Sequence, residues 1–520
     1  MKSIVLLLAL AGATAQASAP PSRLWGTLEP GPHAVGYRLL ERYDASRVYR
    51  LPRDLEGRPR AGERARPIAV SVWYPAAPGA GVPMTFGDYA ALAAHEDRFG
   101  KLSAAEERER GEALYRFGVM ARLTPEQRAG LLPLPSMAVR DAAPLAGPFP
   151  VILYSLGSAA LAHATPEYLA SHGYVVVQAP RVGATAGLPP DNFDTLDLVT
   201  KLRDMDVMLN ALRELPSADL HRLGVVGFSA GGRWGLQKAM EDPDVLAVVS
   251  LDTVMLFNDA VGALWRKLPG FDLDAVRVPV LHVIRRPWVA QEDASMWEGM
   301  RYADRTTLVF EDARLDHFDF QSTGLASTLT GGRAELAPVV AKTFELWNRA
   351  TLAFFDAHVK GDPKARAFLA RAPEENGAPA GLVTVSRLAA QAPTPTLAEV
   401  LNAIDEGNVE AVVRLYAKPG DKPRLPEAVM NLTGYNVLGT GRTADAIRLF
   451  ELNAAAYPAS ANACDSLGDA YLAAGDRARA LEMSRRAAQL LKADTATDPE
   501  RKRRIQESID QKLKVLEGKS

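Results

Sequence analysis

The chain has almost no cysteine, because Cys464 is the only one in 520 residues. An intramolecular disulfide and a cysteine-based metal cluster are therefore both excluded. The sequence also lacks a dominant charge, since 60 basic and 62 acidic side chains leave a formal net charge of −2. That balance gives no electrostatic reason to expect a nucleic-acid partner or a charged membrane surface. Cys464 stands in a helical pattern, and we expect it to be a small buried apolar residue.

Long apolar runs are missing outside the N-terminus. The opening MKSIVLLLALAGATAQASAPPS combines a lysine, a short apolar segment and an A-x-A cleavage pattern that ends at Ala17. The apolar segment is too short to span a bilayer, although an uncleaved anchor or a buried helix remains an alternative. We predict a signal peptide over residues 1–17, a mature start near Ser18, and export to the periplasm or the medium. No transmembrane segment is predicted in the mature protein.

A length of 520 residues is too great for one ordinary core, so two or more domains are expected. From residue 18 to residue 371, short apolar runs alternate with helical stretches. The runs are IAVSVWYP, FPVILYS, GYVVVQAP, LGVVGFS, LAVVSLD, VPVLHVI and TTLVFE. Runs of this kind suit strands buried on both faces, and the helical connections indicate a largely parallel sheet. We predict an α/β fold with helices on both faces of the sheet.

One interval, residues 84–147, is longer than a crossover connection needs. Its segments FGDYAALAAHEDRFG, SAAEERERGEALYRFGVMARL and TPEQRAGLL are all helical in character. Thr124 followed by Pro125 is typical of a helix N-cap with proline at the first helical position. The interval is either a helical cap over an active site or a decoration packed on the sheet edge.

The C-terminal part of the chain repeats with a period of 34 residues. Residues 372–397 are rich in alanine, proline and glycine and are predicted to be a linker. After it, Gly407, Gly441 and Gly475 recur at 34-residue spacing. With the L-G-x-x-Y pattern in SLGDAYL, this period resembles tetratricopeptide repeats. The resemblance implies an all-α helical-repeat domain over residues 398–520, which would bind another protein or a second copy of the chain.

The stretch LGVVGFSAGGRWGL contains a G-x-S-x-G motif centred on Ser229. An apolar strand precedes it and a helical pattern follows it, which is the expected setting of a nucleophilic serine. The flanking glycines allow strand and helix to approach closely at a sharp turn. The turn lifts the serine hydroxyl clear of the sheet, and the helix N-terminus favours developing negative charge. The alternative is a glycine-rich turn without a catalytic role.

A nucleophilic serine needs a base, and in this fold the chain order is serine, acid, histidine. Three histidines follow Ser229. His282 lies inside a predicted strand, and His358 lies in a predicted packing helix. His317 follows the last predicted strand, where a catalytic histidine is expected. We predict His317 as the base.

Two carboxylates compete for the role of the acid. Asp252 ends the run LAVVSLD in apolar surroundings, where a lone carboxylate is costly unless it is paired. It would be tolerated there if it accepted a hydrogen bond from the His317 ring, although it could also cap a turn. Asp293 follows the next strand, where most α/β-hydrolases carry the acid. It stands in QEDAS, which is typical of a solvated helix start. Asp252 is our prediction and Asp293 the alternative.

Several stretches together resemble the platelet-activating-factor acetylhydrolase family of α/β-hydrolases, which is related to the dienelactone-hydrolase-like group. They include GPHAVGYRLL, FPVILYSLGS, YLASHGYVVVQAPR, GFSAGG, SLDTVMLF and LDHFDF, over residues 30–320. The resemblance implies an acid on the strand after the nucleophile helix, which is Asp252 here. The family commonly has Ser-His-Gly where this chain reads Ser155-Leu156-Gly157, so the resemblance does not define the shape of the pocket. The resemblance implies esters of small acyl groups as substrates.

An oxyanion hole in this fold uses backbone N–H groups rather than side chains. We expect donors from Ala230 and from the loop after FPVILYS, with Ser158 as the predicted loop donor and Leu156 or Gly157 as alternatives. The whole pattern predicts a serine carboxylic-ester hydrolase that needs no metal or organic cofactor and acts on a small-molecule or lipid-like ester. A peptidase, or a polyester or carbohydrate-ester hydrolase with the same triad, is the first alternative. A non-catalytic interaction protein is the second.

Overall fold

The computed structural model describes residues 22–518 except 80, 117, 156, 188–194, 254–259, 393, 419–421 and 496. The predicted signal peptide and the start near Ser18 lie outside the described residues. The chain divides into two compact units, Met1–Gln391 and Ala392–Ser520. Within the described residues, none of the helices combines the length and apolar character needed to cross a membrane.

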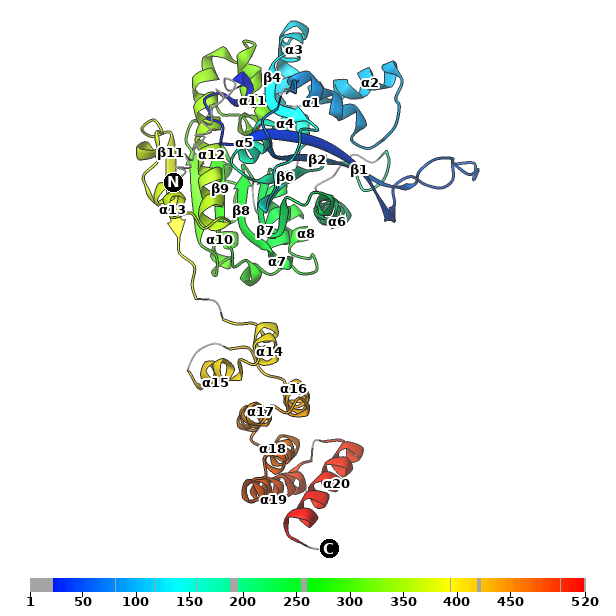
Figure 1. The fold of residues 1–520 in the computed structure, drawn as a ribbon, viewed down its shortest axis with the longest axis vertical. Helices are drawn as coiled ribbons and strands as arrows, with labels where there is room; N and C mark the ends of the chain where they lie inside the picture. Colours follow the sequence, from blue (N-terminus) through cyan, green and yellow to red (C-terminus); the bar gives the residue numbers. More distant parts are fainter. Residues whose placement is uncertain are drawn as a thin grey trace, which may run out of the picture. The chain divides into compact units, whose positions relative to one another are not determined.

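The first unit is built on a mixed sheet (Figure 1), whose described strands run in the order β11-β10-β9-β8-β7-β5-β6-β2-β1-β4-β3. The strands are β1 Ala34–Val48, β2 Ala65–Ala76, β3 Pro83–Thr85, β4 Pro135–Arg140, β5 Phe149–Ser155, β6 Val175–Gln178, β7 Ala218–Phe228, β8 Val245–Leu251, β9 Val280–Arg285, β10 Arg305–Phe310 and β11 Val383–Leu388. From β6 to β10 the neighbours are parallel, whereas β1, β2 and β11 pair antiparallel with β2, β6 and β10 respectively. All seven predicted runs form strands, and the connections between successive strands from β5 to β10 contain helices.

Helices surround this sheet. The α-helices of the first unit are α1 Phe86–Leu92, α2 Ala104–Gly111, α3 Pro125–Leu131, α4 Ala159–Ala162, α5 Ala164–Ser171, α6 Thr195–Ala211, α7 Gly231–Glu241, α8 Ala260–Trp265, α9 Arg286–Val289, α10 Ser295–Gly299, α11 Ser322–Leu329, α12 Ala337–His358 and α13 Pro363–Ala370. The 3-10 helices are η1 Arg23–Trp25, η2 Ala93–His95, η3 Glu112–Arg116, η4 Gly118–Arg122, η5 Leu212–Glu214, η6 Leu273–Ala275, η7 His317–Phe320, η8 Ala334–Leu336 and η9 Glu374–Asn376.

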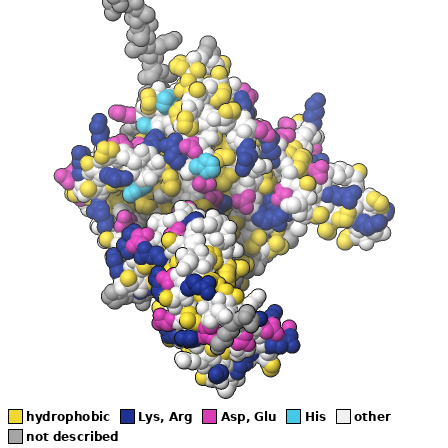
Figure 2. Space-filling model, turned by 60° about the horizontal axis from the view of Figure 1, so that its bottom comes forward, with side chains coloured by type: hydrophobic (Ala, Val, Ile, Leu, Met, Phe, Trp, Pro, Cys, Tyr) yellow, Lys and Arg dark blue, Asp and Glu magenta, His cyan; other side chains and the backbone are white. Residues whose placement is uncertain are grey.

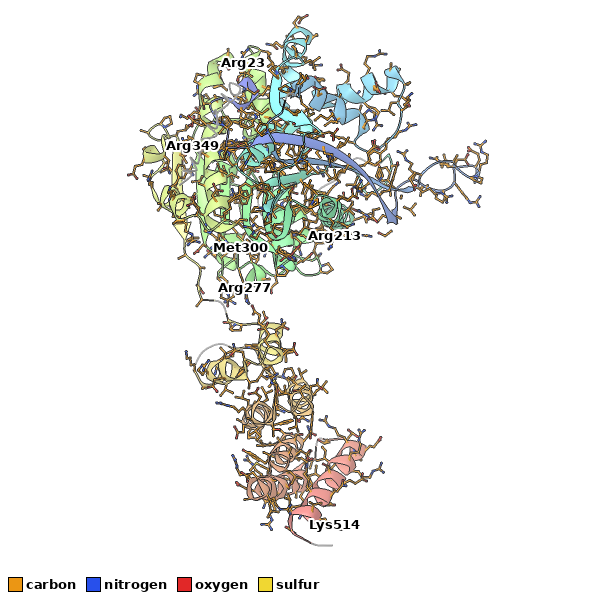
Figure 3. The ribbon with its side chains drawn as sticks, viewed as in Figure 1. Arg23, Arg213, Arg277, Met300, Arg349 and Lys514 are labelled. Atoms are coloured by element: carbon orange, nitrogen blue, oxygen red, sulfur yellow. The ribbon has the colours of Figure 1, made fainter. Side chains whose placement is uncertain are left out.

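The central strands are apolar throughout because they face a core on each side. In β6, Val176 packs in one core with residues of α5 and α12, whereas Val175 and Val177 pack in the other with residues of α6 and α7. This alternation follows from the two-residue period of a strand. Side chains from both layers fill the space beside the sheet (Figure 3), and Met300, which is labelled there, is fully buried in the second core. Over the face shown in Figure 2, acidic and basic side chains are interspersed with hydrophobic ones.

The structure corrects two expectations about the borders of this unit. Residues 372–397 are not all linker, because β11 forms within them and pairs with β10 from Val383↔Phe310 to Leu388↔Arg305. The run LVTVSRL is short and β-branched, and it covers what would be an open strand edge. The interval 84–147 is not all helical either, since β4 extends the sheet beside β1 and β3 pairs with β4. Thr124 does cap α3, with Pro125 at its first turn, as the sequence predicted.

The second unit is helical. Its helices are α14 Leu397–Asp405, α15 Val409–Ala417, α16 Glu427–Gly439, α17 Thr443–Ala456, α18 Ala461–Ala473, α19 Arg477–Ala493 and α20 Pro499–Leu516. Gly407, Gly441 and Gly475 stand at the turns inside successive helix pairs, with φ of 86°, 82° and 79°. A glycine adopts this left-handed conformation without the cost that a side chain brings, which explains its 34-residue recurrence. Cys464 is fully buried in α18 and unpaired.

Candidate active site

Ser229 occupies a strained turn between β7 and α7. Its φ is 53°, a left-handed conformation that is uncommon for a residue with a side chain and that clusters at functional sites. Its N–H donates to the carbonyl of Leu251, 2.9 Å away, at the end of the neighbouring strand. A Cβ at Gly227 would lie 2.2 Å from the carbonyl oxygen of Gly231. The motif therefore needs glycine at position 227 because strand and helix leave no room for a side chain.

Thr253 fixes the same turn from the other side. Its buried hydroxyl donates to the Ser229 carbonyl at 2.5 Å. A Cβ at Gly232 would lie 2.3 Å from this hydroxyl, so the second glycine after Ala230 also has a packing reason. The sequence offered no signal for Thr253, because its role depends on the strand order.

His317 begins η7, directly after the Asp316 cap that follows β10. Its Nδ1 lies 2.6 Å from Oδ2 of Asp252, and the side chain of Asp252 is fully buried. With Nδ1–H donating to the carboxylate, Nε2 is the ring atom left to exchange a proton. Phe228, the residue before Ser229, stacks on the His317 ring with centroids 4.3 Å apart. This stacking holds the ring beside the serine turn.

Asp252 follows β8 and has a φ of 45°. Its own N–H donates to the carbonyl of Val283 on β9 at 2.6 Å. The carboxylate is not a lone buried charge, because Arg285 also donates to it. The backbone N–H of Arg285 reaches Oδ1 at 3.1 Å, and its Nε reaches Oδ2 at 2.9 Å. The last residues of the apolar run LAVVSLDTVMLF lie outside the described residues.

Asp293, the alternative acid, has other partners. Its carboxylate pairs with Arg266 at 3.2 Å and accepts the backbone N–H of Ser295 at 2.9 Å. The hydrogen bond from the Ser295 backbone holds the pKa of Asp293 below its usual value. Asp293 thus bonds Arg266 and the first N–H of α10, while the Nδ1 of His317 is hydrogen-bonded to Asp252 instead.

The two predicted oxyanion donors lie on neighbouring loops. Ser155 at the end of β5 is the register partner of Gly227 on β7, so the loops that follow them share one edge of the sheet. Ala230 precedes α7 and Ser158 precedes α4. Gly157 has a φ of 115°, and Leu156 lies outside the described residues. Both backbone N–H groups are thus at the edge that carries Ser229.

In the described part of the chain, the Ser229 hydroxyl and the His317 ring are not joined by a hydrogen bond. Catalytic hydrogen bonds are often long or poorly aligned before substrate binds and tighten in the complex with substrate. The other two candidate histidines are placed elsewhere. His282 is fully buried in β9, with Nε2 2.9 Å from Oε1 of Glu292. His358 ends α12 and packs on Phe354.

The interval 84–147 contacts the candidate site at two places. Arg122 of η4 pairs with Asp316 at 3.2 Å, and a Cβ at Gly118 would lie 2.5 Å from the ring of Phe318. On the other side, Glu96 is hydrogen-bonded to the Ser158 side chain, and burial raises the pKa of this glutamate to about 8. The interval therefore both extends the sheet edge and packs on the loops that carry His317 and Ser158.

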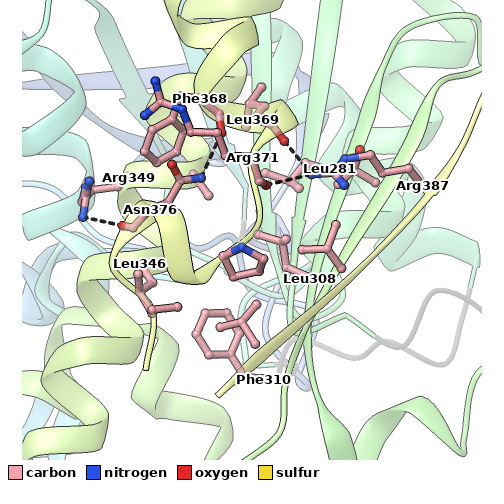
Figure 4. Close-up of a pocket in the computed structure, with 16 residues that line it drawn as sticks. Leu281, Leu308, Phe310, Leu346, Arg349, Phe368, Leu369, Arg371, Asn376 and Arg387 are labelled. Atoms are coloured by element: carbon pink, nitrogen blue, oxygen red, sulfur yellow. Dashed lines mark hydrogen bonds between the residues drawn. The ribbon is translucent and has the colours of Figure 1, made fainter. Parts of the chain in front are cut away.

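A separate apolar pocket lies between the sheet edge and the C-terminal helices of the first unit (Figure 4). It contains none of the predicted site residues. Leu281, Leu308 and Phe310 line it from the sheet, and Leu346 and Phe368 line it from the helices. No cluster of three or more histidine, cysteine, aspartate or glutamate side chains suited to a metal ion occurs in the described ranges.

Comparison with known proteins adds little to this geometry. No model of a known protein family matches the chain, and no curated protein matches it. The solved structures that match include a ferulic acid esterase from Streptomyces cinnamoneus, with 20% sequence identity and a TM-score of 0.47. That match covers 69% of this chain and 98% of the esterase chain. Neither value is high enough to identify a function.

Proposed function

We propose that the chain is a serine carboxylic-ester hydrolase with Ser229 as nucleophile, His317 as base and Asp252 as acid. The observation that carries the proposal is the 2.6 Å hydrogen bond between His317 and Asp252. It lies at the sheet edge where Ser229 stands on a strand-to-helix turn with φ of 53°. Ser229, Asp252 and His317 also follow one another in the chain order that this chemistry uses.

The reaction follows from these groups. The Ser229 oxygen attacks the ester carbonyl while Nε2 of His317 accepts the hydroxyl proton. The buried Asp252 carboxylate keeps the ring oriented and stabilises the imidazolium that forms. Backbone N–H groups of Ala230 and Ser158 stabilise the negative oxygen of the tetrahedral intermediate. The intermediate expels the alcohol, which takes the proton from His317, and leaves an acyl-enzyme on Ser229. His317 then accepts a proton from a water molecule that attacks the acyl group. The carboxylic acid product leaves as the proton on His317 returns to the Ser229 oxygen.

Small acyl groups, such as acetyl, are our proposed substrates, because the chain resembles platelet-activating-factor acetylhydrolases over residues 30–320. Peptide, polyester and acylated-carbohydrate substrates remain the alternative, since the same triad cleaves them. Initial rates on p-nitrophenyl acetate, butyrate and octanoate, a peptide anilide and an acetylated sugar separate these classes. The proposal predicts turnover of at least one ester that Ser229→Ala and His317→Gln abolish. Equal turnover by wild type and both variants would contradict it.

For the second unit we keep the proposal that its helix pairs bind a peptide, a protein or a second copy of the chain. The 34-residue recurrence of helix pairs supports this, because stacked pairs form extended surfaces. A chain ending at Gln391, the border of the first compact unit, tests whether the repeats serve catalysis. Full esterase activity with an intact circular dichroism spectrum would make them an accessory module. Export with a start near Ser18 stays an expectation that N-terminal sequencing of the secreted protein tests.

A further inference from the structure

Arg285 is placed at the carboxyl end of β9, next to the strand end that carries Asp252. The register pairs Leu251 with Val283, so the residues that follow both strands meet at one edge of the sheet. From this position Arg285 reaches both carboxylate oxygens, through its backbone N–H at 3.1 Å and its Nε at 2.9 Å. Its guanidinium is also held in place. Nη1 donates to the Leu315 carbonyl at 3.4 Å, and the group lies 4.9 Å from the centre of the Trp288 ring.

One carboxylate oxygen therefore serves two donors of different kinds. Oδ2 of Asp252 accepts from His317 Nδ1 at 2.6 Å and from Arg285 Nε at 2.9 Å. The guanidinium keeps its positive charge at every pH that a folded protein experiences. The imidazole carries a positive charge only while it holds the extra proton. The two groups consequently interact with the same negative charge. The positive charge of Arg285 is permanent, whereas that of His317 depends on its extra proton.

We infer that Arg285 is a positioning residue of the triad, which fixes the Asp252 carboxylate and moderates its pull on the protonated His317 ring. The inference rests on the proposed function for its catalytic meaning, whereas the coupling of the three groups is a property of the fold. A fixed positive charge beside the carboxylate makes the imidazolium less favourable.

The other charged groups around His317 already have partners of their own. Asp316 pairs with Arg122 of η4 at 3.2 Å. Asp319, on the same turn as His317, pairs with Arg333 at 2.7 Å. The rings that contact His317 are those of Phe228, Trp288 and Phe318, which carry no charge. Within the described residues, Arg285 is thus the cation bonded directly to the carboxylate that holds the ring.

A purely structural role predicts a different result from a positioning role. If Arg285 only bonded the Leu315 carbonyl and packed on the Trp288 ring, its loss would destabilise the fold without moving the protonation of His317 in the molecules that remain folded. If Arg285 moderates the Asp252 charge, its loss moves the protonation midpoint of the ring to higher pH. A shift of roughly 0.5–1 pH unit is expected for the removal of one nearby charge in a partly screened site.

The test is a pH titration of the His317 ring by NMR in full-length protein with labelled histidine, in which His317→Gln assigns the signal. Arg285→Met should move the midpoint to higher pH by roughly 0.5–1 unit. Arg285→Lys keeps the positive charge, so its midpoint should stay within about 0.3 pH unit of the wild-type midpoint. Arg286→Met is the matched control, because Arg286 is the adjacent arginine and bonds Glu311 through Nε at 2.6 Å.

An unchanged midpoint in folded Arg285→Met, or an equal shift in Arg286→Met, would overturn the inference. Should Arg285→Met fail to fold, Arg285→Gln removes the same charge and is judged by the same criterion. The titration does not depend on turnover, so it separates this inference from the proposed function. When turnover is measured, the acid limb of the kcat/KM profile should move with the NMR midpoint. Absence of turnover in wild type would contradict the esterase proposal and leave the titration result standing on its own.

Discussion

His317 and Asp252 are 65 residues apart in the sequence, yet Nδ1 of the ring and Oδ2 of the carboxylate are 2.6 Å apart in the structure. The contact joins a turn after β10 to the end of β8, across the intervening strand β9. The sequence predicted both residues and their pairing, and the structure supplies the distance. This short distance favours Asp252 over Asp293 as the acid, since Asp293 is hydrogen-bonded to Ser295 and paired with Arg266.

Replacement of the acid should therefore slow acylation selectively. Asp252→Asn keeps the size of the side chain but removes the charge and disturbs the ring tautomer, and we expect a loss of about 10²–10⁴-fold in acylation rate. Asp293→Asn is the matched control, and its rate should stay within about twofold of wild type because its carboxylate bonds Arg266 and the Ser295 backbone rather than His317. Stopped-flow acylation by a p-nitrophenyl ester measures both. Comparable losses in the two variants would count against Asp252 as the acid.

The Thr253 hydroxyl should matter for the serine turn. Thr253→Val removes the donor to the Ser229 carbonyl and leaves that carbonyl without its partner, which costs about 1–3 kcal/mol of unfolding free energy. Thr253→Ser keeps the hydroxyl and should lose much less. Urea unfolding followed by tryptophan fluorescence gives the two values. The proposal for this residue fails if valine and serine variants are equally stable.

Gly118 should tolerate substitution poorly because it packs closely against the Phe318 ring. Its φ is 59°, and an added Cβ would lie 2.5 Å from the Phe318 ring. We expect Gly118→Ala to lower the unfolding free energy by about 1–3 kcal/mol. Gly111→Ala is the control, since nothing lies within 4 Å of an added Cβ there. Because Phe318 adjoins His317, Gly118→Ala should also reduce esterase turnover, and a variant as stable and active as Gly111→Ala would contradict this packing.

Glu96 should make stability fall with rising pH. Burial raises its pKa to about 8 from a model-peptide value of 4.5. Below pH 4.5 the carboxyl is protonated in both the folded and the unfolded chain, so the full stability is present. Between pH 4.5 and about 8 only the unfolded chain releases the proton, so stability is lost as the pH rises. Above that range the effect is constant.

The measurement for Glu96 is the Tm of wild type and Glu96→Gln from about pH 5 to about pH 9, a range that includes the raised pKa of about 8. The difference in Tm, variant minus wild type, should increase up to about pH 8 and then level off. Glu107→Gln, an exposed position on α2, should give a difference that does not change with pH. A flat difference for Glu96→Gln would show that this carboxyl is not protonated in the folded chain at neutral pH.

Local pattern was enough to predict much of the first unit. The run FPVILYS is β5 from its first to its last residue, because a short apolar run with β-branched residues is typical of a buried strand. The residues of β11 were assigned to a linker because their strand character depends on the exposed edge of β10, which is far away in sequence. The strand β4 was missed for the same reason, since its partner β1 lies outside the interval 84–147, and β3 was missed with it because β3 pairs with β4.

The candidate site divides in a similar way. Ser229 could be predicted because the glycines around it record a local constraint. Arg285 could not be predicted, since its importance depends on β8 and β9 being parallel neighbours whose ends coincide. Had that register been known, an arginine two residues after the partner of Leu251 would have pointed to Asp252. The role of Glu96 could not be predicted either, because its segment shows only a helical pattern and its contact with Ser158 depends on tertiary packing.

Covalent labelling tests the central claim most directly. Full-length protein is treated with a fluorophosphonate probe, digested, and analysed by mass spectrometry, with Ser229→Ala and Ser386→Ala as variants. The account predicts a single phosphonate adduct on Ser229, abolished in Ser229→Ala and unchanged in Ser386→Ala, whose serine lies on the exposed edge strand β11. An adduct that persists in Ser229→Ala, or the absence of any adduct on wild type, would contradict it.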